Sequence, residues 1–158
     1  MLQILQIIIV LSSLILGIIL KKIAKQETKQ YKKYLEISEK VILLILILTL
    51  LSLKFNYYMI LTFVLGYFLI FNIQFYLGFS LLLSFLINQN YNFLISSLIF
   101  IFNLIYARNI TIKKIPIYLV FFIMPFILFF FKEFVMQNIN LFLSFTAGAL
   151  FRNLVKFK

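Results

Sequence analysis

The stretch that decides the fold is the longest uncharged run of the chain, residues 55–107, which reads FNYYMILTFVLGYFLIFNIQFYLGFSLLLSFLINQNYNFLISSLIFIFNLIYA. A helix that crosses a membrane needs about 20 mostly apolar residues, with about 17 as the lower limit. The run is therefore long enough for two full crossings or for three short ones. Breaks are available at Asn72-Ile73-Gln74 and at Asn88-Gln89-Asn90, because consecutive polar amides prefer water to hydrocarbon.

The rest of the chain is also apolar, with further uncharged runs at 1–20, 41–53, 115–131 and 134–151. The whole sequence is 65% hydrophobic and 12% charged, whereas soluble domains are about 45–50% apolar and about 25% charged. Most of the chain is therefore expected to lie in lipid. The predicted fold is an all-α, polytopic integral membrane helix bundle, in which residues 1–158 form a single transmembrane domain.

The positions of lysine and arginine favour three crossings in the long run, because cytoplasmic loops are enriched in these residues. Three crossings give seven helices with the amino terminus outside and the carboxyl terminus in the cytoplasm. Only Lys54 and Lys132 then lie outside, whereas six helices, the fallback, would distribute the cations almost evenly. The cations predicted inside are Lys21, Lys22, Lys25, Lys29, Lys32, Lys33, Lys40, Arg108, Lys113, Lys114, Arg152, Lys156 and Lys158.

Two of the seven predicted helices are short for a membrane. Segments 57–72 and 73–88 have about 16 residues each, so they tilt poorly, thin the bilayer, or form a re-entrant pair instead.

A basic cytoplasmic loop is predicted at 21–36. That region is either an ordinary loop that fixes orientation or an interfacial helix lying on anionic lipid. The predicted helices lie near 2–20, 37–54, 57–72, 73–88, 91–107, 115–131 and 135–152.

The residue types present exclude most catalytic machinery. The chain has no Asp, His or Cys, so it offers no cluster of His, Cys, Asp or Glu for a metal ion and no Ser-His-Asp arrangement. Its four Glu (27, 36, 39 and 133) are expected in loops or at headgroup level, away from the bilayer centre. We therefore predict no catalytic residues, no metal site and no cofactor. The one enzymatic exception is a lipid-modifying enzyme whose catalytic residues come from a partner.

Polar and small side chains within the apolar runs are the remaining candidates for function. Asn72, Gln74 and Asn103 either line a solute path or make interhelical hydrogen bonds. Arg108 and Arg152 either hold a lipid phosphate or anchor helix ends at the headgroups. Small residues spaced four apart allow two helices to approach closely, either within the chain or against a partner protein. The least bulky stretch of this kind is 144–149. These small residues are Ser13, Gly17, Ser80, Ser84, Ser144 and Gly148.

The leading functional hypothesis is a non-catalytic accessory or structural subunit that packs with other membrane proteins. The alternative is a small oligomeric permease or flippase for a neutral or amphipathic solute. Expected partners are the bilayer, its anionic headgroups, and a membrane protein or further copies of the chain. The net charge of +11 is explained by the lysines and arginines expected in short cytoplasmic loops between membrane spans. No nucleic-acid partner is therefore predicted. The expected location is a prokaryotic plasma membrane, with an organelle inner membrane as the alternative.

Overall fold

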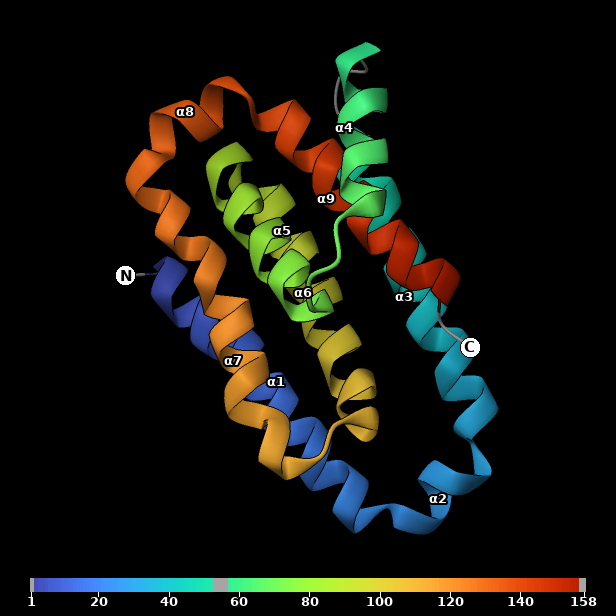
Figure 1. Ribbon diagram of the computed structural model, residues 1–158. Coiled ribbons are helices and arrows are strands. Elements are labelled where there is room, and N and C mark those ends of the chain that lie inside the picture. Colours follow the sequence, from blue (N-terminus) through green and yellow to red (C-terminus); the bar gives the residue numbers. More distant parts are fainter. Residues whose placement is uncertain (1, 53–56, 157–158) are drawn as a thin grey trace.

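The computed structural model describes residues 2–52 and 57–156, and these residues form helices without any strand (Figure 1). The predicted all-helical fold is confirmed over this part of the chain. Lys54 and Lys158, two cations used in the topology prediction, lie outside the described residues. The elements are α1 (Leu2–Ile23), α2 (Lys25–Gln30), α3 (Lys32–Leu51), α4 (Tyr57–Phe68), α5 (Ile73–Ile87), α6 (Gln89–Tyr106), the 3-10 turns η1 (Ala107–Asn109) and η2 (Ile112–Lys114), α7 (Ile115–Ile123), the 3-10 helix η3 (Met124–Phe131), α8 (Lys132–Gln137) and α9 (Ile139–Lys156).

Three helical segments of the described chain are long and apolar enough to cross a membrane: Gln3–Ile23, Gln89–Asn109 and Ile112–Gln137. α4 and α5 are apolar but have only 12 and 15 residues. At 1.5 Å per residue they extend about 18 Å and about 22 Å, less than a hydrocarbon layer of about 30 Å. Length and composition of the described helices therefore support three membrane crossings, and the predicted seven crossings are not confirmed.

The short helix α5 occupies the centre of the bundle (Figure 1). It packs against α6, α7, η3 and α9, and most of its residues, from Ile73 to Ser84, are buried. Its start and the start of α6 coincide with the two breaks predicted from the amides. The side chain of Asn72 accepts a hydrogen bond from the backbone N–H of Gln74 at 3.1 Å, and Asn88 accepts one from Tyr91 at 2.8 Å. Each amide thus satisfies a backbone donor that the first helical turn leaves free.

Several boundaries differ from the sequence prediction. The region 21–36, predicted as a loop, is helical except at Ala24 and Tyr31, because α1 extends to Ile23 and α3 already begins at Lys32. α4 ends at Phe68, so residues 69–72 form a linker instead of the last turn of a helix. The segment 115–131 changes from α to 3-10 at Met124, immediately before Pro125. Proline lacks the N–H needed for an α-helical bond, which accounts for the change. The last helix is displaced by four residues, from 135–152 to Ile139–Lys156.

Candidate functional site

A buried ion pair joins α3 to η1, the turn that follows α6. The Nε of Arg108 lies 3.1 Å from Oε1 of Glu39, and the Glu39 side chain is 0% exposed and that of Arg108 10% exposed. Removing two charges from water is costly, so such a pair persists only with good geometry and further hydrogen bonds. Arg108 supplies one of these, because its Nη1 donates to the carbonyl of Lys32 at 2.9 Å.

The carboxylate of Glu39 is not fully satisfied within the described residues. Oε1 also accepts a longer hydrogen bond from Nδ2 of Asn109 at 3.4 Å, and Oε2 is buried without a partner. Glu36, which is partly exposed, lies 4.0 Å from Nη2 of Arg108. The guanidinium is therefore engaged by two carboxylates and a carbonyl, which leaves it little capacity for a free phosphate.

Sequence reasoning missed the burial of Glu39, which it expected at headgroup level together with Glu36 and Lys40. A signal was present in the spacing: Glu39, Leu43, Leu46 and Leu50 are separated by four, three and four residues. Together with Ile47, these four positions form the buried stripe of α3, as expected for one face of a helix. The charge of Glu39 outweighed that pattern in the prediction.

A second buried polar contact joins α5 to α6 at the first turn of α5. Nε2 of Gln74 donates to Oδ1 of Asn103 at 3.0 Å, and both side chains are fully buried. Oε1 of Gln74 and Nδ2 of Asn103 have no partner within the described chain. Exchanging the N and O of both amides leaves the same number of unpaired atoms, so the deficit does not depend on amide assignment. The structure thus brings together two of the three amides singled out in the sequence, whereas Asn72 caps α5.

Arg152 contacts the linker between α4 and α5. Its Nη1 donates to the carbonyl of Leu69 at 3.1 Å, and the hydroxyl of Tyr76 donates to the same carbonyl at 3.0 Å. The linker carbonyl is thereby satisfied although it lies outside a helix. Within the described residues, the hydrogen-bond and ion-pair partners of Arg108 differ from the partner of Arg152, so the structure does not combine the two arginines into one phosphate site.

The small residues at four-residue spacing lie in contacts between helices of the same chain. A side chain at Gly148 would collide with the carbonyl of Phe63, and one at Gly66 with the carbonyl of Phe145, so α4 and α9 approach closely. Gly17 lies against Leu104 in the same way. The 144–149 face is therefore occupied by α4. Ser13, Ser80 and Ser84 are buried and donate to backbone carbonyls of their own helices, and Ser144 donates to that of Met59 in α4.

A polar network that was not predicted lies on α1, α5 and α6. Nδ2 of Asn92 donates to Oε1 of Gln6 at 2.6 Å, and the hydroxyls of Ser84 and Ser96 donate to Oδ1 of Asn92 at 3.3 and 3.1 Å. Within the part of the chain described, no polar side-chain atom of this network is both buried and unpaired. The network therefore holds the three helices together.

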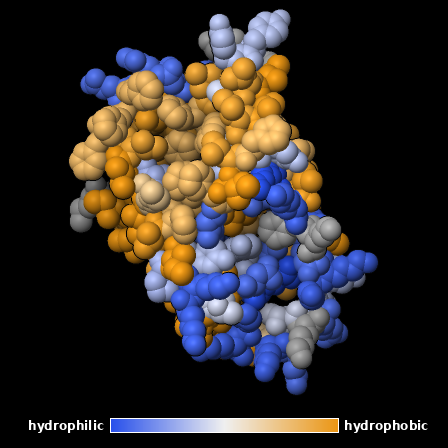
Figure 2. Space-filling view, viewed as in Figure 1, coloured by the Kyte–Doolittle hydropathy of each residue, from blue (hydrophilic) through white to orange (hydrophobic). Residues whose placement is uncertain are grey.

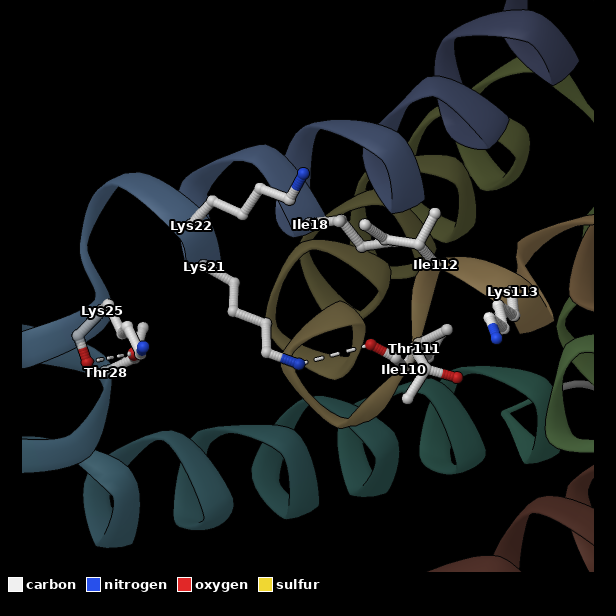
Figure 3. Close-up of a pocket in the computed structure, with 9 residues that line it drawn as sticks. All are labelled: Ile18, Lys21, Lys22, Lys25, Thr28, Ile110, Thr111, Ile112 and Lys113. Carbon is white, nitrogen blue, oxygen red and sulfur yellow. Dashed lines mark hydrogen bonds between the residues drawn. The ribbon is translucent and has the colours of Figure 1, made fainter.

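A basic pocket of about 870 Å³ lies where α1 runs into α2 (Figure 3). A smaller pocket of about 150 Å³ shares Lys21 and Thr28 with it and extends to Lys32, Arg108 and Asn109. Among the described residues, no group of three or more His, Cys, Asp or Glu is placed to hold a metal ion. The lining residues of the larger pocket are Ile18, Lys21, Lys22, Lys25, Thr28, Ile110, Thr111, Ile112 and Lys113.

Comparison of the chain with protein-family models, with curated proteins and with solved structures found no match.

Proposed function

We propose that the protein is a multi-pass membrane protein that works without catalytic residues of its own, as a subunit that packs against another membrane protein. The observation that carries the proposal is the linker at residues 69–72. Figure 1 places this linker part of the way along the bundle, away from the end where α1 meets α2. The chain thus leaves helical structure between two apolar helices that are too short to cross the bilayer.

The linker is poorly covered by its own chain. Ile70 is 75% exposed, and its backbone makes no hydrogen bond to the residues that the structure describes. Within hydrocarbon, non-helical backbone is tolerated only where protein buries it or where it lines a water-filled cavity. Cover by a neighbouring membrane protein meets this requirement and also buries the apolar side chains of Phe68, Ile70 and Phe71.

A single introduced thiol tests the proposal, since the chain has no cysteine. Ile70→Cys is expected to resist a membrane-impermeant maleimide in native membranes, and a photo-crosslinking residue at position 70 is expected to capture a defined second protein. Ile8→Cys on α1, also exposed and apolar, is the lipid-facing control, and it should give neither label nor crosslink. A labelled thiol at position 70 in a chain that purifies alone would contradict the subunit proposal.

The second candidate function is a small permease or flippase for a neutral or amphipathic solute. The unpaired oxygen of Gln74 and the unpaired amide nitrogen of Asn103 favour it, because together they present one acceptor and one donor. Gln74 lies in the first turn of α5, directly after the linker that a water-filled cavity would solvate, and Asn103 faces it from α6. A hydroxyl or amide of a passing solute would satisfy both atoms.

Lipid translocation in proteoliposomes tests this second candidate. A fluorescent phosphatidylcholine analogue, quenched from outside by dithionite, is expected to be translocated by the unmodified protein and not by the Asn103→Leu variant. Asn90→Leu, which removes an exposed amide, is the matched control and should retain translocation. Equal activity of all three proteins would remove the solute path from consideration.

The finer topology belongs to the same proposal. Seven segments, with the amino terminus outside and the carboxyl terminus in the cytoplasm of a prokaryotic cell, place nearly all cations on one side. Reporter fusions to each end and maleimide labelling at Tyr34→Cys and Gln137→Cys locate the two faces. Both engineered thiols reacting from the same side would contradict the arrangement.

A further inference from the structure

We infer that the basic pocket at the junction of α1 and α2 binds the phosphate of an anionic phospholipid headgroup. The site is separate from the 69–72 linker and from the Gln74–Asn103 pair. It does not depend on whether the chain has a protein partner or moves a solute.

The pocket gathers cations from segments that are distant in the sequence. Lys21 and Lys22 come from the last turn of α1, Lys25 from α2, and Lys113 from η2. Figure 3 shows Lys21 reaching across to the carbonyl of Ile110, to which its Nζ donates at 3.3 Å. This bond ties the end of α1 to the segment that precedes η2, and residues of α1, α2 and η2 line one pocket.

No ion pair within the described residues compensates the lysines of the pocket. No acidic side chain lines it, and these four lysines form no ion pair with the described residues, in contrast to Lys32 and Arg108 of the adjacent smaller pocket. The hydroxyls of Thr28 and Thr111 add polar groups that can donate to phosphate oxygens. Lysine acts on phosphate as a point charge and needs no fixed bidentate geometry. The pocket therefore favours an anion with several oxygen atoms.

The position of the pocket favours a lipid over a soluble phosphate. The apolar segment Gln3–Ile23 ends here and the apolar segment Ile112–Gln137 begins here, and Figure 2 shows hydrophilic residues gathered at this end of the molecule. The pocket therefore lies where a spanning chain leaves hydrocarbon. Ile18, Ile110 and Ile112 form its apolar side. A phospholipid can place its phosphate among the lysines and its glycerol and upper acyl carbons on these isoleucines. Free phosphate has no group for that side.

Native mass spectrometry of the detergent-solubilised full chain tests the inference. Phosphatidylglycerol is the probe, phosphatidylcholine is the zwitterionic comparison, and glycerol 3-phosphate is the soluble comparison. Each lysine near an anionic headgroup strengthens lipid binding about fivefold, and screening by salt reduces this factor. The triple variant K21Q/K25Q/K113Q should therefore bind phosphatidylglycerol at least about tenfold more weakly. The matched control is K33Q/K40Q/K156Q, which removes the same charge from exposed lysines outside the pocket.

The expected result is preferential binding of phosphatidylglycerol that the pocket variant loses and the control variant keeps. Equal loss in both variants would show a diffuse attraction to net charge and would overturn the inference. Binding of glycerol 3-phosphate as tight as that of the lipid would overturn the assignment to lipid. Far-UV circular dichroism of each variant confirms that the helices are retained, and an unfolded pocket variant would be replaced by the single change K113Q.

Discussion

The buried pair of Glu39 and Arg108 allows a quantitative prediction about stability. In Glu39→Leu the guanidinium of Arg108, 10% exposed, loses its charged partner at 3.1 Å. Breaking a buried ion pair by removing one member costs about 3–5 kcal/mol, because the remaining charge stays out of water. Glu36, 4.0 Å from the guanidinium, offers partial replacement, so we expect the lower end, about 3 kcal/mol.

The reverse change and the double change complete a thermodynamic cycle. Arg108→Met loses the hydrogen bond to the carbonyl of Lys32 and leaves a carboxyl group that becomes neutral by binding a proton at little further cost, so we expect a smaller cost, about 2 kcal/mol. The double variant removes both charges and loses the hydrogen bond from Arg108 to the carbonyl of Lys32, which alone accounts for about 2 kcal/mol. The double variant is thus about 3 kcal/mol more stable than the sum of the single changes predicts.

The assay is reversible unfolding in mixed micelles with increasing dodecyl sulfate, followed by far-UV circular dichroism. Glu39→Gln is a useful additional variant because it keeps an acceptor for Arg108 while removing the charge, and it should fall between the unmodified protein and Glu39→Leu. Single variants that each cost less than about 1 kcal/mol, with an additive double variant, would refute the reasoning. They would show that both side chains reach water in the native protein.

Three further changes have expected outcomes. Gly148→Leu introduces a side chain against the carbonyl of Phe63, so it should separate α4 from α9. The dodecyl sulfate titration should then show a lower unfolding midpoint, and an unchanged midpoint would contradict that packing. Asn103→Leu removes the only hydrogen-bond partner of the Gln74 side chain within the described residues and should cost about 1–3 kcal/mol. The double change with Gln74→Leu should recover most of this loss, and a fully additive result would count against the pair. Tyr91→Phe removes the hydroxyl that donates to the carbonyl of Thr49 and should cost about 1 kcal/mol; hydrogen exchange near the end of α3 should rise, and unchanged exchange would argue against this link.

The positions where two helices start could be predicted because the responsible residues act on nearby backbone. Asn72 and Asn88 cap the helices that follow them, and both lie in the amide clusters marked as breaks. The change to 3-10 geometry before Pro125 has a local cause of the same kind, the missing N–H of proline. The end of α4 at Phe68 was not predictable in this way, because residues 69–71 are apolar and compatible with a helix. The carbonyl of Leu69, in the linker, accepts hydrogen bonds from Arg152 and Tyr76. Arg152 is distant in the sequence, and Tyr76 lies beyond the start of the next helix, so neither contact could be read from the residues next to Phe68.

The candidate site was less accessible to sequence reasoning. The spacing of Ser144 and Gly148 indicated a close helix contact, yet many apolar helices could have filled it, and the structure shows α4 there. Glu39 was placed among headgroups because a lone carboxyl is costly to bury. Its burial becomes tolerable only beside Arg108, which lies on a different helix.

The sequence by itself determined that the chain is helical and rich in apolar surface, because transfer to lipid and hydrogen bonding within a helix depend on residue type and on near neighbours. Only the tertiary structure decided which polar groups meet: Glu39 with Arg108, Gln74 with Asn103, and the lysines of α1, α2 and η2 around one pocket. These pairings depend on the relative rotation and depth of helices far apart in the chain. That geometry is set by the packing of whole surfaces, such as the contact of α4 with α9 through Gly66 and Gly148.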